Sequence, residues 1–219
     1  MDIKNIIDSN NKHTTIVAVS KTKPIDEIQK IYNKGQIDFG ENRVNELIHK
    51  YKLLPKNINW HMIGHLQRNK VKLILPFIHL IHSVDSIRLL NKIENESRKI
   101  NKKTNILLQV HIAQEESKYG FTFSQVKDLF DNDFFNSFDY LNIKGFMGMS
   151  TFTNNKNQIR KEFNNLKVLF DEVKSKFNKV NKNIIIDSLS MGMSGDYKIA
   201  LEEGSNIIRI GSLIFGERE

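Results

Sequence analysis

The chain has 219 residues, of which 39% are apolar, and this is enough for one domain with a sizeable core, expected to span residues 1–219. Because the chain contains no cysteine, a disulfide framework and a thiolate metal site are both excluded. The net charge is +8, but the lysines are scattered and form no basic stripe interleaved with aromatic residues, so we expect no specific nucleic-acid binding.

No stretch of the sequence reaches the apolar length of a membrane span. Residues 1–8 also lack the basic-then-apolar layout of a secretory signal. We therefore expect a cytoplasmic protein that does not associate with membranes.

Eight short apolar runs have the character of β-strands, and most are continuous rather than alternating, as in parallel strands that are buried on both faces. Amphipathic stretches between these runs predict helices, several of them bounded by proline or glycine. In chain order, the strands are expected at 14–20, 37–41, 59–63, 79–84, 105–111, 142–147, 184–189 and 206–210, and the clearest helices at 25–34, 86–100, 157–178 and 195–203.

The alternation of eight strands with helices over about 200 residues predicts an α/β fold of the (β/α)8 type, a TIM barrel. An open doubly wound sheet is the alternative. It needs a glycine-rich phosphate turn after the first strand, and residues 20–24 (SKTKP) provide none. In a TIM barrel the chemistry lies at the C-terminal ends of the strands, so functional residues are expected there.

Two cations stand where a buried strand would carry apolar side chains: Lys21 at the end of the first run and Arg209 within the last. Burying an unpartnered charge is costly, so each points to a site that uses its cation. A lysine in such a place loses part of its preference for the ammonium form and becomes a candidate imine-forming nucleophile. Arginine cannot react in that way, so Arg209 is expected to act electrostatically or through hydrogen bonds.

The loops after the last two strands have the composition of a phosphate cradle. Residues 191–195 (MGMSG) precede a predicted helix, so backbone N–H groups and the Ser194 hydroxyl can face an anion there. Gly211 and Ser212 follow the last strand, and these two loops form the usual phosphate site of the fold. The alternative is that both loops are ordinary turns, with Ser194 capping a helix.

Together these features indicate a ligand with a phosphate at one end and a carbonyl at the other, and pyridoxal 5′-phosphate meets both requirements. At this point the sequence resembles a known family, the pyridoxal-phosphate homeostasis (proline-synthetase co-transcribed) proteins, which are related to the barrel domain of alanine racemase. The matching segments lie in order between residues 18 and 216. They are 18–24 (AVSKTKP), 39–42 (FGEN), 60–67 (WHMIGHLQ) with 69–70 (NK), 116–120 (ESKYG), 189–194 (LSMGMS), 209–212 (RIGS) and 215–216 (FG).

The resemblance implies that Lys21 holds pyridoxal 5′-phosphate as an internal aldimine (a Schiff base). It implies that Arg209 faces the pyridine nitrogen and that Ser194, Gly211 and Ser212 bind the phosphate. Asn42 would lie near the cofactor ring. The fold implied is the alanine-racemase N-terminal-domain type of TIM barrel.

The function implied is intracellular cofactor homeostasis, in which a monomer stores, delivers or buffers pyridoxal phosphate, with apo-enzymes as possible recipients. We expect no substantial catalysis and no catalytic residue, because an arginine at the pyridine nitrogen cannot accept the proton that makes the ring a strong electron sink. Alanine racemase also draws a tyrosine base from a second domain, and with the sequence ending at Glu219 we expect that domain to be absent.

A weak or vestigial amino-acid racemase is the alternative function, and a lysine-dependent aldolase is a more distant one. We expect no metal ion, since the His61 and His65 pair lacks a metalloprotease glutamate, and His79, His82 and His111 are expected to be structural. Lys118 is expected to be an ordinary loop charge, with a second, weaker cofactor site as the other interpretation.

Overall fold

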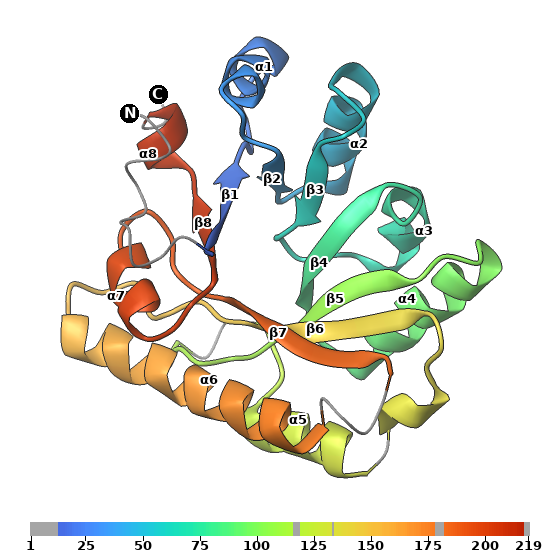
Figure 1. The fold of residues 1–219 in the computed structure, drawn as a ribbon, viewed down its shortest axis with the longest axis vertical. Helices are drawn as coiled ribbons and strands as arrows, with labels where there is room; N and C mark the ends of the chain where they lie inside the picture. Colours follow the sequence, from blue (N-terminus) through green and yellow to red (C-terminus); the bar gives the residue numbers. More distant parts are fainter. Residues whose placement is uncertain (1–12, 116–118, 133, 178–181, 217–219) are drawn as a thin grey trace.

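Eight parallel strands close into a barrel in sequence order, with the last strand pairing with the first (Figure 1). The structure is a computed structural model that describes residues 13–115, 119–132, 134–177 and 182–216. The predicted TIM barrel is confirmed, and its closure excludes the open doubly wound sheet. The strands are β1 (Thr15–Val19), β2 (Asp38–Glu41), β3 (Asn59–Met62), β4 (Ile78–Val84), β5 (Thr104–Gln109), β6 (Leu141–Met147), β7 (Ile184–Ser190) and β8 (Ile207–Ile210).

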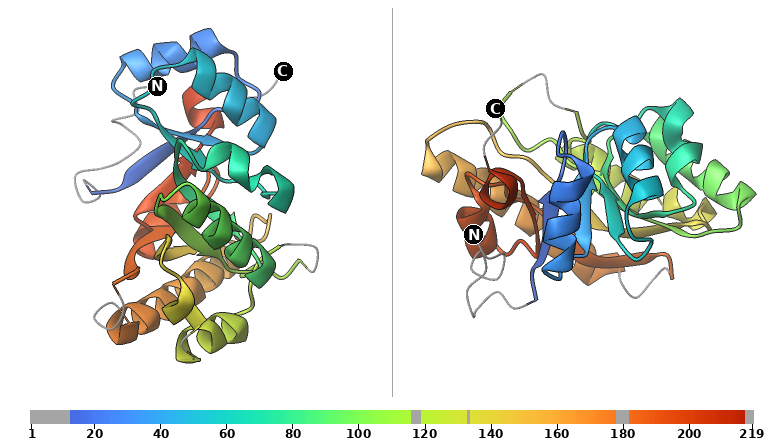
Figure 2. Two further views of the ribbon diagram at one scale, coloured as in Figure 1. Left: turned by 90° about the vertical axis from the view of Figure 1, so that its right-hand side faces the viewer. Right: turned by 90° about the horizontal axis from the view of Figure 1, so that it is seen from above.

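Helices cover the outside of the barrel, as the three views in Figures 1 and 2 show. The four helices predicted individually are present within two residues of their expected bounds. The helical segments are α1 (Ile25–Asn33), α2 (Val44–Leu53), η3 (Arg68–Lys70), α3 (Val71–Ile74), α4 (Ile87–Lys99), α5 (Phe123–Asp131), η4 (Phe134–Ser137), α6 (Lys156–Phe177), α7 (Tyr197–Glu202) and α8 (Ser212–Phe215). Within the described ranges, none of these helices is long and apolar enough to cross a membrane.

Two long helices escaped individual prediction, although one carries a clear start signal. At α5, Thr122 accepts a hydrogen bond from the Gln125 backbone N–H while the Gln125 side chain accepts one from the Thr122 N–H. This reciprocal capping box identifies a helix start in sequence. Helix α2 follows Arg43, whose side chain makes no cap, so its start carries no such signal.

The apolar core has two main layers of unequal size and a third, small cluster of Ile16, Ile208 and Ile210. The larger layer lies between strands and helices and includes Phe39, Trp60 and Phe146. The smaller layer groups five buried residues of strands β1, β4, β5, β6 and β8: Val17, Leu80, Leu107, Met147 and Ile207. The same strands also carry polar side chains that are fully or nearly fully buried. The interior of the barrel, from one mouth to the other, is therefore filled by polar as well as apolar side chains.

Gly145 allows strands β6 and β7 to approach closely at an irregularity in their pairing. Its φ is 145°, and a Cβ at this position would lie 1.9 Å from the Ser188 carbonyl oxygen. Gly35, after helix α1, has a φ of 97° but no atom within 4 Å of an added Cβ. The two positions therefore share an unfavourable φ and differ in the space available.

Replacing Gly145 with alanine should lower the free energy of unfolding by about 3 kcal/mol or more, because the methyl group overlaps the Ser188 carbonyl and the backbone is strained. The control Gly35→Ala carries only the strain and should cost about 1 kcal/mol. Urea unfolding followed by circular dichroism measures both. Equal losses would show that the close approach of β6 and β7 is not a constraint.

Candidate functional site

A cavity of about 710 Å3 lies at the C-terminal ends of strands β1, β2 and β6 to β8. Its lining includes every residue that the sequence singled out for the site. The turn after β1, the loop after β2 and the loops after β7 and β8 therefore surround one cavity. The six residues are Lys21, Asn42, Ser194, Arg209, Gly211 and Ser212.

Lys21 lies two residues beyond the end of β1, in a turn, and its side chain is half-buried. The sequence placed it at the end of the strand itself, so the strand is shorter than expected. In this turn Thr22 has a φ of 66°, and the Lys23 N–H donates to the Ser20 carbonyl at 3.0 Å. A turn held in this way fixes where the Lys21 amine enters the cavity.

A buried ion pair behind the turn holds it against helix α2. The Lys50 ammonium is 2.8 Å from Glu41 and 2.6 Å from Glu46, and it donates to the Ser20 carbonyl at 2.7 Å. The Ser20 hydroxyl donates to Glu41 at 2.5 Å, and the Thr22 N–H donates to Glu46 at 2.6 Å. Burial raises the pKa of the Glu41 carboxyl, while Lys50 and Ser20 act in the opposite direction. The backbone on both sides of Lys21 is therefore fixed by charge-assisted hydrogen bonds.

Arg209 lies in β8 with only 4% of its surface exposed. Its guanidinium donates to the Ser190 carbonyl at 2.8 Å, the Ser190 hydroxyl at 2.5 Å and the Gly148 carbonyl at 3.0 Å. Burial lowers the pKa of Arg209 to about 10, and Asp196 acts in the opposite direction. The group therefore stays protonated near neutral pH, where it can donate hydrogen bonds but cannot accept a proton.

Ser190 continues into a chain of buried hydrogen bonds that crosses the barrel. Its hydroxyl is 3.0 Å from Nδ1 of His82, and Nε2 of His82 is 2.9 Å from Nδ1 of His61. Nε2 of His61 is 3.1 Å from the Asp38 carboxylate. Burial holds the pKa of His82 well below its ordinary value, so this imidazole is neutral, with one N–H to donate. Arg209 is thus connected to the opposite mouth of the barrel.

The loops after β7 and β8 meet at a hydrogen bond from the Gly211 N–H to the Ser194 hydroxyl, 3.3 Å long. Helix α7 begins at Tyr197 with Asp196 in the cap position, so Ser194 is not its N-cap residue. An added Cβ at Gly195 would have no atom within 4 Å, and Ser212 begins α8 beside this open space. Backbone N–H groups and two hydroxyls therefore surround a space that fits an anion.

Asn42 approaches the cavity because the loops after β2 and β3 touch. A Cβ at Gly64 would lie 2.4 Å from the Asn42 carbonyl, so only glycine permits this contact. The side-chain oxygen of Asn42 is buried and accepts no hydrogen bond from the part of the chain that the structure describes. A ligand with a hydroxyl or N–H group could satisfy this acceptor.

Several residues that line the cavity were not predicted from the sequence. Asp196 accepts hydrogen bonds from the Met193 N–H at 2.6 Å and the Ser150 hydroxyl at 2.8 Å. It therefore links the loop after β7 to the loop after β6. Lys23 also lines the cavity, but its ammonium donates to the Phe215 carbonyl at 2.9 Å. Lys118 lies outside the described residues. The only available signal for Asp196 was its place directly after a glycine-rich segment.

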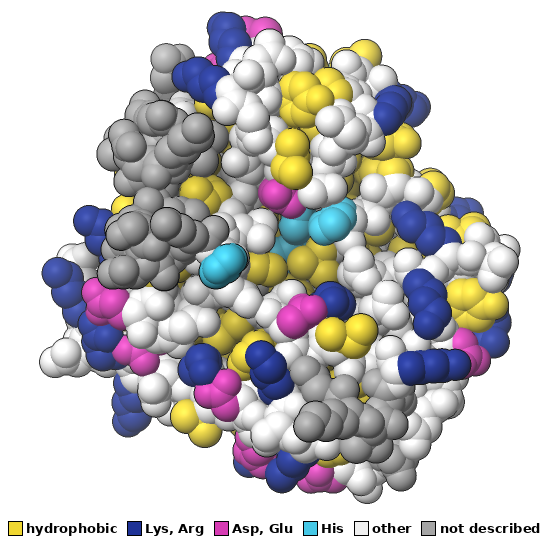
Figure 3. Space-filling model, viewed as in Figure 1, with side chains coloured by type: hydrophobic (Ala, Val, Ile, Leu, Met, Phe, Trp, Pro, Cys, Tyr) yellow, Lys and Arg dark blue, Asp and Glu magenta, His cyan; other side chains and the backbone are white. Residues whose placement is uncertain are grey.

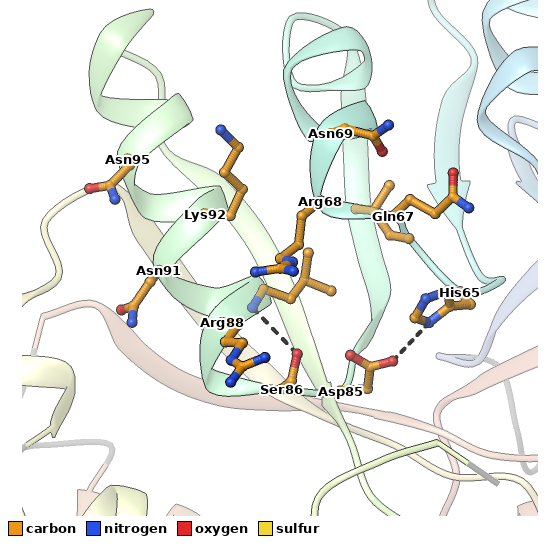
Figure 4. Close-up of a pocket in the computed structure, with 12 residues that line it drawn as sticks. His65, Gln67, Arg68, Asn69, Asp85, Ser86, Arg88, Asn91, Lys92 and Asn95 are labelled. Atoms are coloured by element: carbon orange, nitrogen blue, oxygen red, sulfur yellow. Dashed lines mark hydrogen bonds and ion pairs between the residues drawn. The ribbon is translucent and has the colours of Figure 1, made fainter. Parts of the chain in front are cut away.

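A second, wider cleft of about 1000 Å3 opens between the segment 65–69, which leads from β3 into η3, and helix α4. Figure 4 shows Arg68, Arg88 and Lys92 around it, with His65 and Asp85 paired at its edge, 2.9 Å apart. Both arginines are exposed, and none of the six predicted site residues lines this cleft. The smaller cavity therefore holds the amine, the buried cation and the anion cradle together.

Comparison with known proteins places the chain in a family. The family model described as alanine racemase, N-terminal domain, matches residues 2–219. The chain is 37% identical over 207 residues to the pyridoxal phosphate homeostasis protein of Aquifex aeolicus, covering 93% of this chain and 87% of that protein. It is 39% identical over 206 residues to the protein of the same name from Helicobacter pylori, covering 92% and 87%.

Solved structures agree with the fold. PipY of Synechococcus elongatus, solved with PLP bound, has a TM-score of 0.84 at 26% identity and covers 98% of this chain and 96% of its own. An alanine racemase of Clostridium difficile in complex with cycloserine has a TM-score of 0.77 at 15% identity, covering 99% of this chain and 58% of that one. The expected alanine-racemase type of barrel is therefore confirmed.

Lys50→Met should lower the free energy of unfolding by about 3–5 kcal/mol, because it leaves the buried Glu41 carboxylate without its cation. Lys30→Met is the matched control, since it removes an exposed helical lysine that lies 3.5 Å from Asp26, and it should cost about 0.5 kcal/mol or less. Thermal and urea unfolding measure both variants. Similar small losses would show that the buried pair does not hold the Lys21 turn.

Proposed function

Because the chain belongs to the pyridoxal phosphate homeostasis protein family, within the alanine racemase N-terminal-domain group, we propose that it binds pyridoxal 5′-phosphate and serves intracellular homeostasis of that cofactor. The single observation that carries this proposal is the convergence of Lys21, Arg209 and Ser194 on one cavity. A reactive amine, a buried cation and an anion cradle match the carbonyl, ring and phosphate of this cofactor.

The residues present fit the cofactor. The unsatisfied oxygen of Asn42 offers an acceptor to the phenolic hydroxyl that pyridoxal phosphate carries on its ring. The hydroxyls of Ser194 and Ser212 offer donors to the phosphate, and the Gly211 N–H donates to the Ser194 oxygen, which leaves the Ser194 O–H to donate to the ligand. When bound, pyridoxal phosphate supplies an aldehyde that condenses reversibly with primary amines. Lys21 supplies that amine from a turn held by Lys50, Glu41 and Glu46.

The buried, protonated guanidinium of Arg209 supports a carrier role over that of an efficient enzyme. We propose that its guanidinium faces the pyridine nitrogen, where it remains protonated and leaves that nitrogen without a proton. A racemase with so weak an electron sink needs a base on each face of the substrate. No tyrosine or histidine is among the described residues that line the cavity. We therefore propose that the protein has no substantial catalytic activity.

The carrier role follows from the reversibility of the bond at Lys21. An amine, or the lysine of an apo-enzyme, that enters the cavity can displace the Lys21 amine and take the cofactor away. We propose that a cytoplasmic monomer stores, delivers or buffers pyridoxal phosphate in this way. Apo-enzymes that need the cofactor are the proposed recipients.

Borohydride reduction of the purified protein with pyridoxal phosphate should fix one cofactor per chain, and peptide mapping should locate it at Lys21. Lys21→Ala should lose the attachment, because it removes the amine that enters the cavity. The matched control is Lys23→Ala, which removes a second lysine of the same turn whose ammonium is engaged by Phe215. This variant should retain the attachment at Lys21.

Two results would contradict the proposal. Attachment that survives in Lys21→Ala at a specific second residue would reassign the amine. Robust racemisation of an amino acid by the wild type, abolished in Lys21→Ala, would establish the racemase alternative in place of the carrier role.

Ser194→Ala should weaken the binding of pyridoxal phosphate about tenfold, because it removes a hydrogen bond to a charged phosphate oxygen. Binding of pyridoxal, which lacks the phosphate, should be unchanged. The ratio of the two dissociation constants, measured by spectroscopic titration of wild type and variant, separates the two ligands. An unchanged ratio would remove Ser194 from the phosphate site.

A further inference from the structure

Three side chains that can ligate a metal converge at the mouth of the barrel opposite the cofactor cavity. Asp38 is the first residue of β2, and His79 is the second residue of β4. His61, on β3 between them, points toward both, and one ligand atom of each of the three residues lies within 4.8 Å of the others. The sequence did not indicate this group, because its members are 41 residues apart along the chain.

The group is reachable from solvent on one side. His79 is exposed, Asp38 is half-buried, and His61 is buried within the barrel. Figure 3 shows histidine side chains next to an acidic side chain near the middle of the face seen in Figure 1. An ion could therefore enter through this mouth while a water molecule completes its coordination.

The surroundings of the group fix two of the three ligands in the orientation that a metal needs. Nδ1 of His61 lies 2.9 Å from Nε2 of His82, so an Nδ1–H donor there leaves the lone pair of His61 Nε2 toward Asp38 and His79. His82 in turn has Ser190 as its partner at 3.0 Å. Asn59 donates to the Asp38 carboxylate at 3.1 Å and orients it. Such support is typical of metal ligands.

We propose that Asp38, His61 and His79 form a binding site for a divalent transition-metal ion of the zinc class. Two imidazoles and one carboxylate suit zinc, with a water molecule as the fourth ligand. In such barrels the N-terminal face usually contributes to stability and not to catalysis. The ion therefore links strands β2, β3 and β4 and stabilises their packing, rather than acting as a catalyst. This proposal differs from the expectation, drawn from the sequence, that the chain has no metal site.

The test uses tag-free, full-length protein that has been treated with a chelator and then titrated with zinc chloride by calorimetry. Wild type should bind one equivalent, and saturation should raise the midpoint of thermal unfolding. His79→Gln should weaken binding at least tenfold with little effect on folding, because this side chain is exposed. Asp38→Asn should weaken it as well, with a greater risk to the fold because Asp38 also pairs with Asn59.

Two controls make the outcome decisive. His65→Gln removes the other paired histidine, 2.9 Å from Asp85, and should bind zinc as the wild type does. Lys21→Ala should also bind zinc normally, so a failure of the metal site and a failure of the proposed cofactor site are distinguishable. Cobalt in place of zinc should give visible absorption bands that are lost in His79→Gln.

Absence of saturable binding by the wild type would overturn the proposal. So would binding by His79→Gln that equals the wild type, because the zinc would then occupy another site.

Discussion

The structure depends most on the burial of one guanidinium, that of Arg209, inside the barrel. An isolated buried cation would be prohibitively costly, so acceptors must surround it. The Ser190 carbonyl and hydroxyl, at the end of the neighbouring strand β7, and the Gly148 carbonyl, just past the end of β6, provide them. The ends of β6, β7 and β8 are thereby held at fixed distances around the floor of the cavity.

The part of the cavity that holds Lys21 is stabilised by residues outside the barrel. The pair of Lys50 and Glu41 lies between the strands and helix α2, outside the barrel, and it holds the turn of Lys21 from behind. Arg209 acts from inside the barrel. The cavity therefore has one wall fixed by an outer ion pair and a floor fixed by an inner cation, and neither arrangement requires the other to form.

The fold was predictable because continuous apolar runs and their spacing are local properties of the sequence, and all eight strands were found where expected. The six cavity residues were predictable for a related reason, since strand ends in a parallel barrel meet at one mouth. The burial of Lys50 was not, because its partners come from the residue after β1, from strand β2 and from its own helix, and sequence alone suggests a solvated lysine. The convergence of Asp38, His61 and His79 likewise depends on the lateral register of three strands.

The hydrogen bonds that run from Asp38 through His61 and His82 to Ser190 also have a polarity. Each imidazole in the chain can donate from either ring nitrogen, so the whole row can point toward Asp38 or toward Ser190. A positive charge beside Asp38 selects the second direction, in which Ser190 accepts from both His82 and Arg209. The two mouths of the barrel are therefore electrically coupled by a reversal of dipoles, and no backbone atom needs to move.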